Sequence, residues 1–206
     1  RWRGFGCRGG RRLGPAELRV VTGKACAVIV ELPARFDAIC CTHNHEDHTG
    51  NCAAIAVAHG CPVYLRHAEA LWEEGVRRLA PYRLIWWGRV EPFDAMEMPD
   101  VVESGGRSFE VIPTPGHAAT QAALYEAATG DVFTGDLVIS PGAAAVLTWG
   151  NPWQEAASLR RVAALRPRRM LTGHGLIAED PAPLLELKAE RIEDAAREVC
   201  RQLADL

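Results

Sequence analysis

The stretch that decides the fold reads Thr42-His43-Asn44-His45-Glu46-Asp47-His48-Thr49-Gly50. An apolar run, Phe36–Thr42, leads into it and predicts a buried strand. A segment with helical spacing, Thr49–His59, follows it and stops at Gly60, a common residue after the end of a helix. The polar stretch therefore lies where a strand ends and a helix begins.

The side chains of this stretch are of the types that bind metal ions. Residues two apart in an extended segment point the same way, so His43 and His45 can converge on one ion. Asp47 and His48 lie at the turn into the helix, where the bend of the backbone directs them to an adjacent point. Four ligand-type side chains within six residues predict a metal site at the end of the strand.

Three further segments share one style, because each places a ligand-type residue beside a glycine directly after an apolar run. They are Pro115-Gly116-His117, Thr134-Gly135-Asp136 and Thr172-Gly173-His174. Glycine permits the tight turn that aims the next side chain inward, so we expect the four strand ends to meet at the metal site. Imidazole and carboxylate ligands suit Zn²⁺, Mn²⁺ or Fe²⁺, and the absence of Cys from these positions argues against a purely structural zinc site.

The order His-x-His-x-Asp-His, then His, then Asp, then His resembles the metallo-β-lactamase superfamily and, within it, the glyoxalase II-like branch. The resemblance covers residues 36–175. It implies an α/β (α+β) fold, a four-layer αββα sandwich in which two packed mixed β-sheets are flanked by helices. We therefore expect residues 18–206 to form a single domain of this kind, closed by a C-terminal helix.

Carried over by position, the resemblance implies a cofactor of two divalent ions, Zn²⁺ first, with Mn²⁺ or Fe²⁺ as alternatives. His43, His45 and His117 would hold the first ion, Asp47, His48 and His174 the second, and Asp136 would bridge both. In such sites the ions share a water whose pKa falls to about 7, and the resulting hydroxide attacks a carbonyl or phosphoryl centre. Asp47 would also orient the hydroxide or carry its proton, which makes it the catalytic residue.

The resemblance leaves several functions open. The leading interpretation is hydrolysis of an ester-type bond in a thioester, a lactone or a β-lactam. A persulfide dioxygenase with one iron is the second reading, because such enzymes resemble the chain around residues 114–117 and 133–136. A metal-dependent nuclease is the third, although a net charge of −3 gives no general reason to expect nucleic acid as a partner. The complete set of seven ligands argues against a non-catalytic metal-binding protein.

Two tryptophans follow Asp136 in a loop that contains Gly and Pro. Trp149 and Trp153 could form an apolar wall of the pocket for a small-molecule substrate. Equally, either ring could pack under the helix predicted after the loop. By contrast, His59 ends a predicted helix and His67 begins another, so we interpret both histidines as structural.

The remaining segments predict hairpins and helices in groups, with no regular βαβ alternation. Strands are predicted at Leu18–Val21 and Ala25–Leu32 (a hairpin), Pro62–Arg66, Val101–Glu103, Ser108–Ile112, Ala122–Tyr125, Val132–Thr134 and Arg169–Thr172. Helices are predicted at His67–Leu79, Pro152–Leu165 and Pro181–Leu203, and Pro81–Pro99 is predicted to be loop with some strand. Two sheets packed face to face with helices outside fit this order better than a doubly wound parallel sheet.

The cellular setting follows from composition. Seven cysteines without a regular spacing predict reduced thiols in a cytoplasmic protein. No apolar run approaches the roughly 20 residues that cross a bilayer, so we expect no membrane contact. Residues 1–17 are rich in Arg and Gly and are predicted to be a flexible arm. Only residues 33–35 separate the hairpin from the next strand, so a helix usual in the family has no room, and an uncovered sheet edge would favour a homo-oligomer.

Overall fold

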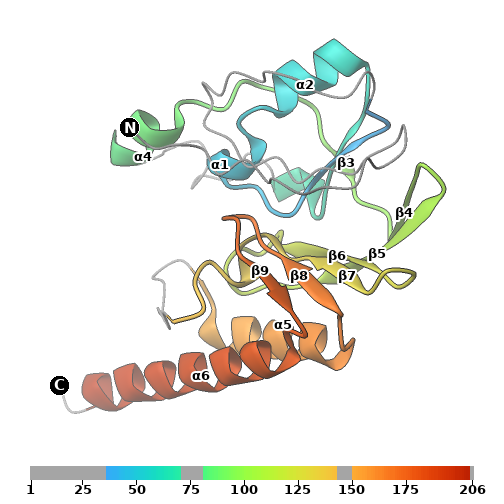
Figure 1. The fold of residues 1–206 in the computed structure, drawn as a ribbon. Coiled ribbons are helices and arrows are strands. Elements are labelled where there is room, and N and C mark those ends of the chain that lie inside the picture. Colours follow the sequence, from blue (N-terminus) through green and yellow to red (C-terminus); the bar gives the residue numbers. More distant parts are fainter. Residues whose placement is uncertain (1–35, 71–80, 143–149, 205–206) are drawn as a thin grey trace, which may run out of the picture.

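Two sheets form the centre of this computed structural model, which describes residues 36–70, 81–142 and 150–204 (Figure 1). The smaller sheet is parallel and consists of β1 (Ile39–Cys41), β2 (Val63–Leu65) and β3 (Met96–Glu97). The larger sheet has the order β4 (Val101–Ser104), β5 (Arg107–Pro113), β6 (Ala122–Glu126), β7 (Asp131–Phe133), β8 (Arg169–Leu171) and β9 (Ile177–Glu179). Its neighbours are antiparallel except for β7 and β8, which are parallel.

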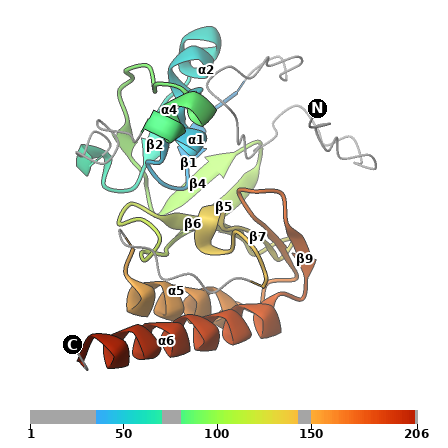
Figure 2. The ribbon, with the colours of Figure 1, turned by 90° about the vertical axis from the view of Figure 1, so that its left-hand side faces the viewer.

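Helices lie on both outer faces of the pair of sheets. The structure has α1 (Glu46–Thr49), α2 (Cys52–His59), η1 (Ala68–Ala70), α4 (Pro81–Trp87), η2 (Gly135–Leu137), α5 (Pro152–Ala164) and α6 (Ala182–Ala204). Figures 1 and 2 show α2 beyond the smaller sheet, and α5 and α6 together beneath the larger one. The order of layers is therefore helix, sheet, sheet, helix, as the resemblance implied.

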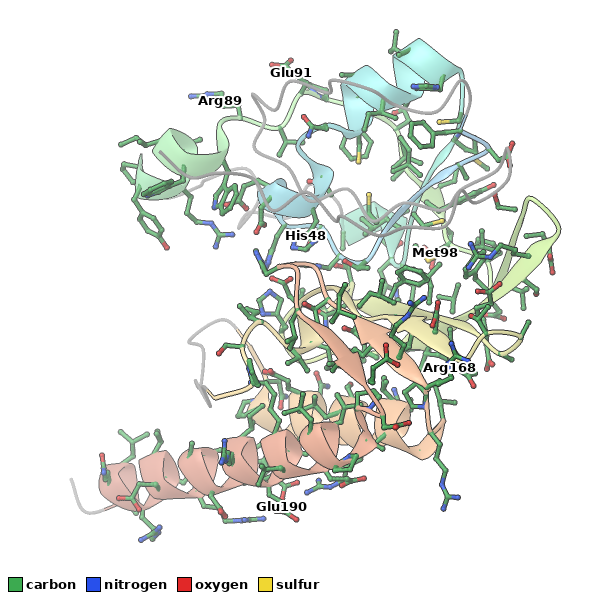
Figure 3. The ribbon with its side chains drawn as sticks, in the orientation of Figure 1. His48, Arg89, Glu91, Met98, Arg168 and Glu190 are labelled. Atoms are coloured by element: carbon green, nitrogen blue, oxygen red, sulfur yellow. The ribbon has the colours of Figure 1, made fainter. Side chains whose placement is uncertain are left out.

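Three apolar interfaces hold these layers together. Cys52 and Ile55 of α2 pack against the smaller sheet, where Val63 and Leu65 are buried. Between the sheets lie Met98, Val102, Phe109, Val111, Ala122, Leu124 and Phe133 (Met98 is labelled in Figure 3). Beneath the larger sheet, side chains of α5 and α6 enclose Ile112, Ala123, Val132 and Met170. Each interface removes apolar surface from water, which is the main favourable contribution to folding.

The alternation of side chains along β6 shows how one strand serves two interfaces. Ala122 and Leu124 face the smaller sheet, whereas Ala123 between them faces the helices. Successive side chains of a strand point to opposite faces of its sheet, so a strand covered on both faces is apolar throughout. This explains why the segment lacks the alternation of apolar and polar residues that a half-exposed strand would show.

The structure corrects several boundaries. The helix expected at Thr49–His59 is two helices, α1 and α2, interrupted near Gly50. The expectation of loop for Pro81–Pro99 was wrong for its first third, which is the helix α4, and right about a strand, β3. Strand β9 was not predicted. Of the helix expected at His67–Leu79, only η1 is described, because residues 71–80 lie outside the described part of the chain.

The predicted arm and first hairpin, which precede residue 36, also lie outside the described residues. The predicted uncovered edge of the first sheet is therefore not tested. Within the described part, no helix combines the length and the apolar character needed to span a bilayer.

Candidate metal centre

The ends of four strands meet at one corner of the sandwich. Strands β5, β7 and β8 run in the same direction, because β6 lies antiparallel between β5 and β7, and β7 is parallel to β8. Their carboxyl ends therefore share one edge of the larger sheet. Strand β1 of the smaller sheet ends at the same place, since the backbone N–H of Ala122 donates to the carbonyl of Thr42 (2.8 Å). Figure 3 shows His48 between α1 and the turn that joins β8 to β9.

Glycines let the chain turn tightly at this corner. Gly116 has a φ of +144°, and a Cβ there would lie 2.4 Å from the Cα of Glu155 on α5. Gly135 has a φ of +53°, and a Cβ there would lie 2.5 Å from Oγ1 of Thr42. Because both the backbone conformation and the space exclude a side chain, only glycine allows the next residues, His117 and Asp136, to reach the centre.

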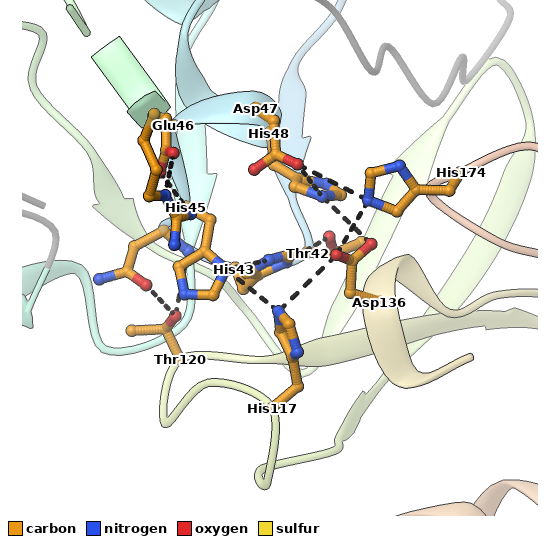
Figure 4. A network of polar contacts seen from close by, with 12 residues as sticks. Thr42, His43, His45, Glu46, Asp47, His48, His117, Thr120, Asp136 and His174 are labelled. Carbon is orange, nitrogen blue, oxygen red and sulfur yellow. Dashed lines mark hydrogen bonds and ion pairs between the residues drawn. The ribbon is translucent and has the colours of Figure 1, made fainter. Parts of the chain in front are cut away.

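The first group of ligand-type side chains consists of His43, His45 and His117. Nδ1 of His45 lies 3.0 Å from Nε2 of His43 and 3.1 Å from Nε2 of His117 (Figure 4). Nitrogens that bind one tetrahedral zinc ion at 2.0–2.1 Å lie about 3.3 Å apart, so this spacing is close to that of a metal site. Nδ1 of His43 shares a hydrogen bond with Oγ1 of Thr42 (3.2 Å), which leaves its Nε2 facing the group.

The second group consists of Asp47, His48, Asp136 and His174, whose ligand atoms all lie within 4.8 Å of one another. Nε2 of His174 lies 3.1 Å from Oδ2 of Asp136 and 3.6 Å from Oδ2 of Asp47. The side chain of His174 is 32% exposed, while that of Asp136 is 4% exposed. The second group is therefore open to solvent on the side of His174.

Asp136, a member of the second group, also approaches the first. Its Oδ1 is 3.2 Å from Nε2 of His48 in the second group, and its Oδ2 is 3.7 Å from Nε2 of His117 in the first. The rings of His43 and His48, which belong to different groups, also approach each other, with 4.1 Å between centroids. The two groups thus adjoin, and one carboxylate contacts both.

Burial and hydrogen bonding both shift the pKa values of side chains at the centre. Burial lowers the pKa of His43 and His117, and it lowers the pKa of His45 to about 3, with neighbouring positive groups adding to the effect. For Asp136, burial acts upward on the pKa, but hydrogen bonding to His174 and the proximity of His48 outweigh it and hold the pKa below its usual value. Neutral imidazoles and an ionised carboxylate at neutral pH are the forms that bind metal ions.

The polar atoms at the centre fit a divalent ion. Among the described residues, Nε2 of His48 and Oδ1 of Asp136 are buried without a hydrogen-bond partner. A buried polar atom without a partner is costly, and a cation between these atoms would satisfy both. The donors are imidazole nitrogens and carboxylate oxygens, the set that suits zinc, manganese and iron.

Sequence reasoning missed two pairs of residues that support this corner. The hydroxyl of Thr120 donates to Oδ1 of Asn44 and accepts from the backbone N–H of Asn44, both at 3.1 Å, so the loop after His117 is tied to the motif. The guanidinium of Arg83 on α4 binds the carboxylate of Glu46. Each pair joins residues far apart in the sequence, so no local sequence pattern predicts the contact.

The other candidate residues are not members of the two groups or lie outside the described residues. Trp149 is outside them. Trp153 is 46% exposed at the start of α5, and the guanidinium of Arg197 on α6 lies 5.8 Å from its ring centroid. The ring of His59 packs edge-on against Phe36, with 4.5 Å between centroids, as expected for a structural histidine. His67 lies at the surface near Glu69.

The layered fold and this corner together define a family. The family model described as the metallo-beta-lactamase superfamily matches residues 25–174, and the chain belongs to this superfamily. Among curated relatives, a hydroxyacylglutathione hydrolase of Alkalilimnicola ehrlichii is 37% identical over 141 residues, which are 68% of this chain and 48% of that protein. Another, of Thermosynechococcus vestitus, is 28% identical over 195 residues, 92% of this chain and 69% of that protein.

These relatives support the glyoxalase II-like branch, although the chain spans about half the length of the curated relatives that it matches first. Solved structures agree on the fold. A metallo-beta-lactamase family protein of Thermus thermophilus has a TM-score of 0.62 at 22% identity, covering 79% of this chain and 61% of that one. The protein TTHA1623, solved in a di-iron-bound form, has a TM-score of 0.57 at 28% identity, covering 73% and 74%.

Proposed function

We propose that the chain is a metal-dependent hydrolase that cleaves an ester-type bond of a small molecule with the help of two divalent ions. One observation carries the proposal: two groups of ligand-type side chains adjoin at the edge of the sheets, and Asp136 contacts members of both. Sites with two adjacent ions are common among enzymes that hydrolyse esters and phosphoesters. The membership of the chain in the metallo-β-lactamase superfamily supports the same class of reaction.

The proposed ligands follow the two groups. His43, His45 and His117 would hold one ion, Asp47, His48 and His174 the other, and the carboxylate of Asp136 would contact both. When bound, a pair of such ions activates a water molecule and stabilises the negative charge that develops on the substrate oxygen. We expect Zn²⁺, with Mn²⁺ or Fe²⁺ as alternatives. Iron is one of the alternatives because the similar protein TTHA1623 was solved in a di-iron-bound form.

Asp47 is our candidate for moving a proton. Burial, with Asp136 adding to it, raises the pKa of its carboxyl above the usual value, so Asp47 holds a proton more readily than an exposed aspartate. Its Oδ2 lies 3.7 Å from Nε2 of His48 and 3.6 Å from Nε2 of His174. A carboxylate in this position can orient the attacking water and accept its proton at Oδ2.

The substrate should approach from the side of His174, because His174 is the most exposed residue in either group. Among ester-type bonds we favour a thioester, since several relatives are named hydroxyacylglutathione hydrolase. Lactones and β-lactams remain the alternatives. A substrate contact by Trp149 or Trp153, a cytoplasmic location and a homo-oligomer stay predictions.

Metal analysis combined with a substrate panel tests the proposal. Purified protein is stripped with a chelator, reloaded separately with Zn²⁺, Mn²⁺ or Fe²⁺, and assayed for metal per chain and for hydrolysis of thioester, lactone, β-lactam and phosphodiester substrates. We expect two ions per chain and release of a thiol from the thioester. One iron per chain with oxygen uptake on a persulfide would instead favour the dioxygenase, and phosphodiester cleavage would favour the nuclease. Protein that takes up no metal would overturn the proposal.

A further inference from the structure

A carboxylate that belongs to neither group of ligand-type side chains is buried within the metal-binding motif. Glu46 stands between His45 and Asp47 in the sequence, and its side chain is only 1% exposed. An ionised carboxylate in the interior is costly unless a cation and hydrogen bonds compensate for its lost hydration. Its partner therefore matters for the geometry of the motif.

That partner is Arg83, which reaches the motif from helix α4. Nε of Arg83 donates to Oε1 of Glu46 at 2.5 Å, and Nη2 donates to Oε2 at 2.9 Å. Two parallel hydrogen bonds of this kind fix the orientation of both groups as well as their distance. Figure 4 shows Glu46 at the end of the network that lies farther from His174. None of the side chains of α4 is fully buried, and this ion pair links the helix to the motif.

We infer that Arg83 is a positioning residue: its ion pair with Glu46 holds the backbone of the metal-binding motif, and so the directions of its two flanking ligands. Residues adjacent in sequence share backbone geometry, so a shift of the Glu46 carboxylate turns the ligands on either side. The inference rests on the proposed metal site. It assigns to α4, a segment absent from the motif pattern, a part in building the centre.

A matched ion pair elsewhere in the fold provides the control. Arg107 at the start of β5 binds Glu126 at the end of β6 through Nε at 2.7 Å and Nη2 at 2.5 Å. The exposures are nearly equal: 21% for Arg83 and 1% for Glu46, against 25% for Arg107 and 3% for Glu126. Because β5 continues toward His117 at its other end, this second pair lies at the end of the strand remote from the centre.

The experiment compares Arg83→Lys with Arg107→Lys. Lysine keeps the charge but cannot present the planar fork, so each variant loses one bidentate geometry. The readouts are titration of the metal-free protein with Zn²⁺ against a chromophoric chelator, the visible spectrum of the Co²⁺-loaded protein, kcat and KM for the thioester, and the melting temperature. For Arg83→Lys we expect the ion of lower affinity to bind about tenfold less tightly than in the parent protein. We also expect kcat to fall about tenfold, with KM changed little.

For Arg107→Lys we expect a similar loss of melting temperature, with metal affinity, Co²⁺ spectrum and kcat within about twofold of the parent. A double variant, Arg83→Gln with Glu46→Gln, removes both charges and leaves no unpaired charge in the interior. This double variant should fold, and it should bind the ion of lower affinity less tightly than the parent protein does. If the parent protein binds two ions, equal metal affinities and equal Co²⁺ spectra for the two lysine variants would overturn the inference. A parent protein that binds no metal would instead overturn the proposed function.

Discussion

Nε2 of His48 and Oδ1 of Asp136 lie 3.2 Å apart in the interior, and neither atom has a hydrogen-bond partner among the described residues. The two residues come from different sheets, since His48 follows β1 and Asp136 follows β7. Their meeting therefore depends on how the two sheets pack. Buried polar atoms without hydrogen-bond partners are free to bind a metal ion, which would satisfy both of them.

Replacing Asp136 with alanine tests its proposed contact with both ions. Its carboxylate offers one oxygen near each group, and its negative charge offsets part of the repulsion between two dications. We expect Asp136→Ala to retain about one ion per chain and to lose activity by roughly 100-fold or more. The control is His59→Ala, which removes a ring packed against Phe36. Two ions and near-normal rates in both variants would show that the assignment is wrong.

Gly173 offers a test in which no proposed ligand residue is replaced. A Cβ at this position would lie 2.7 Å from Oδ1 of Asp136 and 2.7 Å from Cε1 of His48. A methyl group there has no room unless the two ligands move apart, so we expect Gly173→Ala to weaken binding of the second ion at least about tenfold. Gly142→Ala is the control, because a Cβ there would meet nothing within 4 Å. Isothermal titration with Zn²⁺ would measure the difference, and equal affinities would contradict the close packing described.

The reaction should slow in acid. The activated water must be unprotonated, so its protonation as the pH falls removes the nucleophile. Because burial lowers the pKa of His43, His45 and His117, we expect these rings to remain neutral at neutral pH. We predict that kcat/KM is constant above about pH 7 and falls with an apparent pKa near 6–7. A constant rate down to about pH 5, with the metal retained, would argue against this mechanism.

Glu155 predicts a dependence of stability on pH that is separate from catalysis. Burial raises its pKa from 4.5 to about 7, while Lys188 opposes the shift. Between these values the folded protein keeps a proton that the unfolded chain has lost, so stability falls as the pH rises through this window. Glu155→Gln removes the titration. We expect it to raise the melting temperature of the metal-free protein by roughly 2–4 °C at pH 8 and to change it little at pH 4. An equal effect at both pH values would contradict the prediction.

Much of the centre was predictable from the sequence because its signals are local. His43 and His45 alternate at the end of an apolar run, and His117, Asp136 and His174 each follow a glycine directly after such a run. Strand ends, turns and alternation depend on neighbouring residues, so short patterns were enough to indicate which side chains would gather. The resemblance of their order to a known family then indicated the layered fold, which the structure confirms.

Other features depended on tertiary contacts. Strand β9 has three residues, Ile177–Glu179, too few for a pattern, and it is defined by its pairing with β8. The segment Pro81–Trp87 contains aromatic and apolar residues without a buried side, so its helical form was not visible in the hydrophobic pattern.

The sequence by itself determined which residues can bind metal and that they stand at strand ends, because those properties reside in side-chain chemistry and local backbone geometry. Only the tertiary structure decided that Asp136, a member of the second group, also approaches the first and that Arg83 reaches Glu46. Both contacts join segments that are far apart in the chain. They form only when the two sheets and α4 come together, and no periodicity within either segment encodes the distance between them.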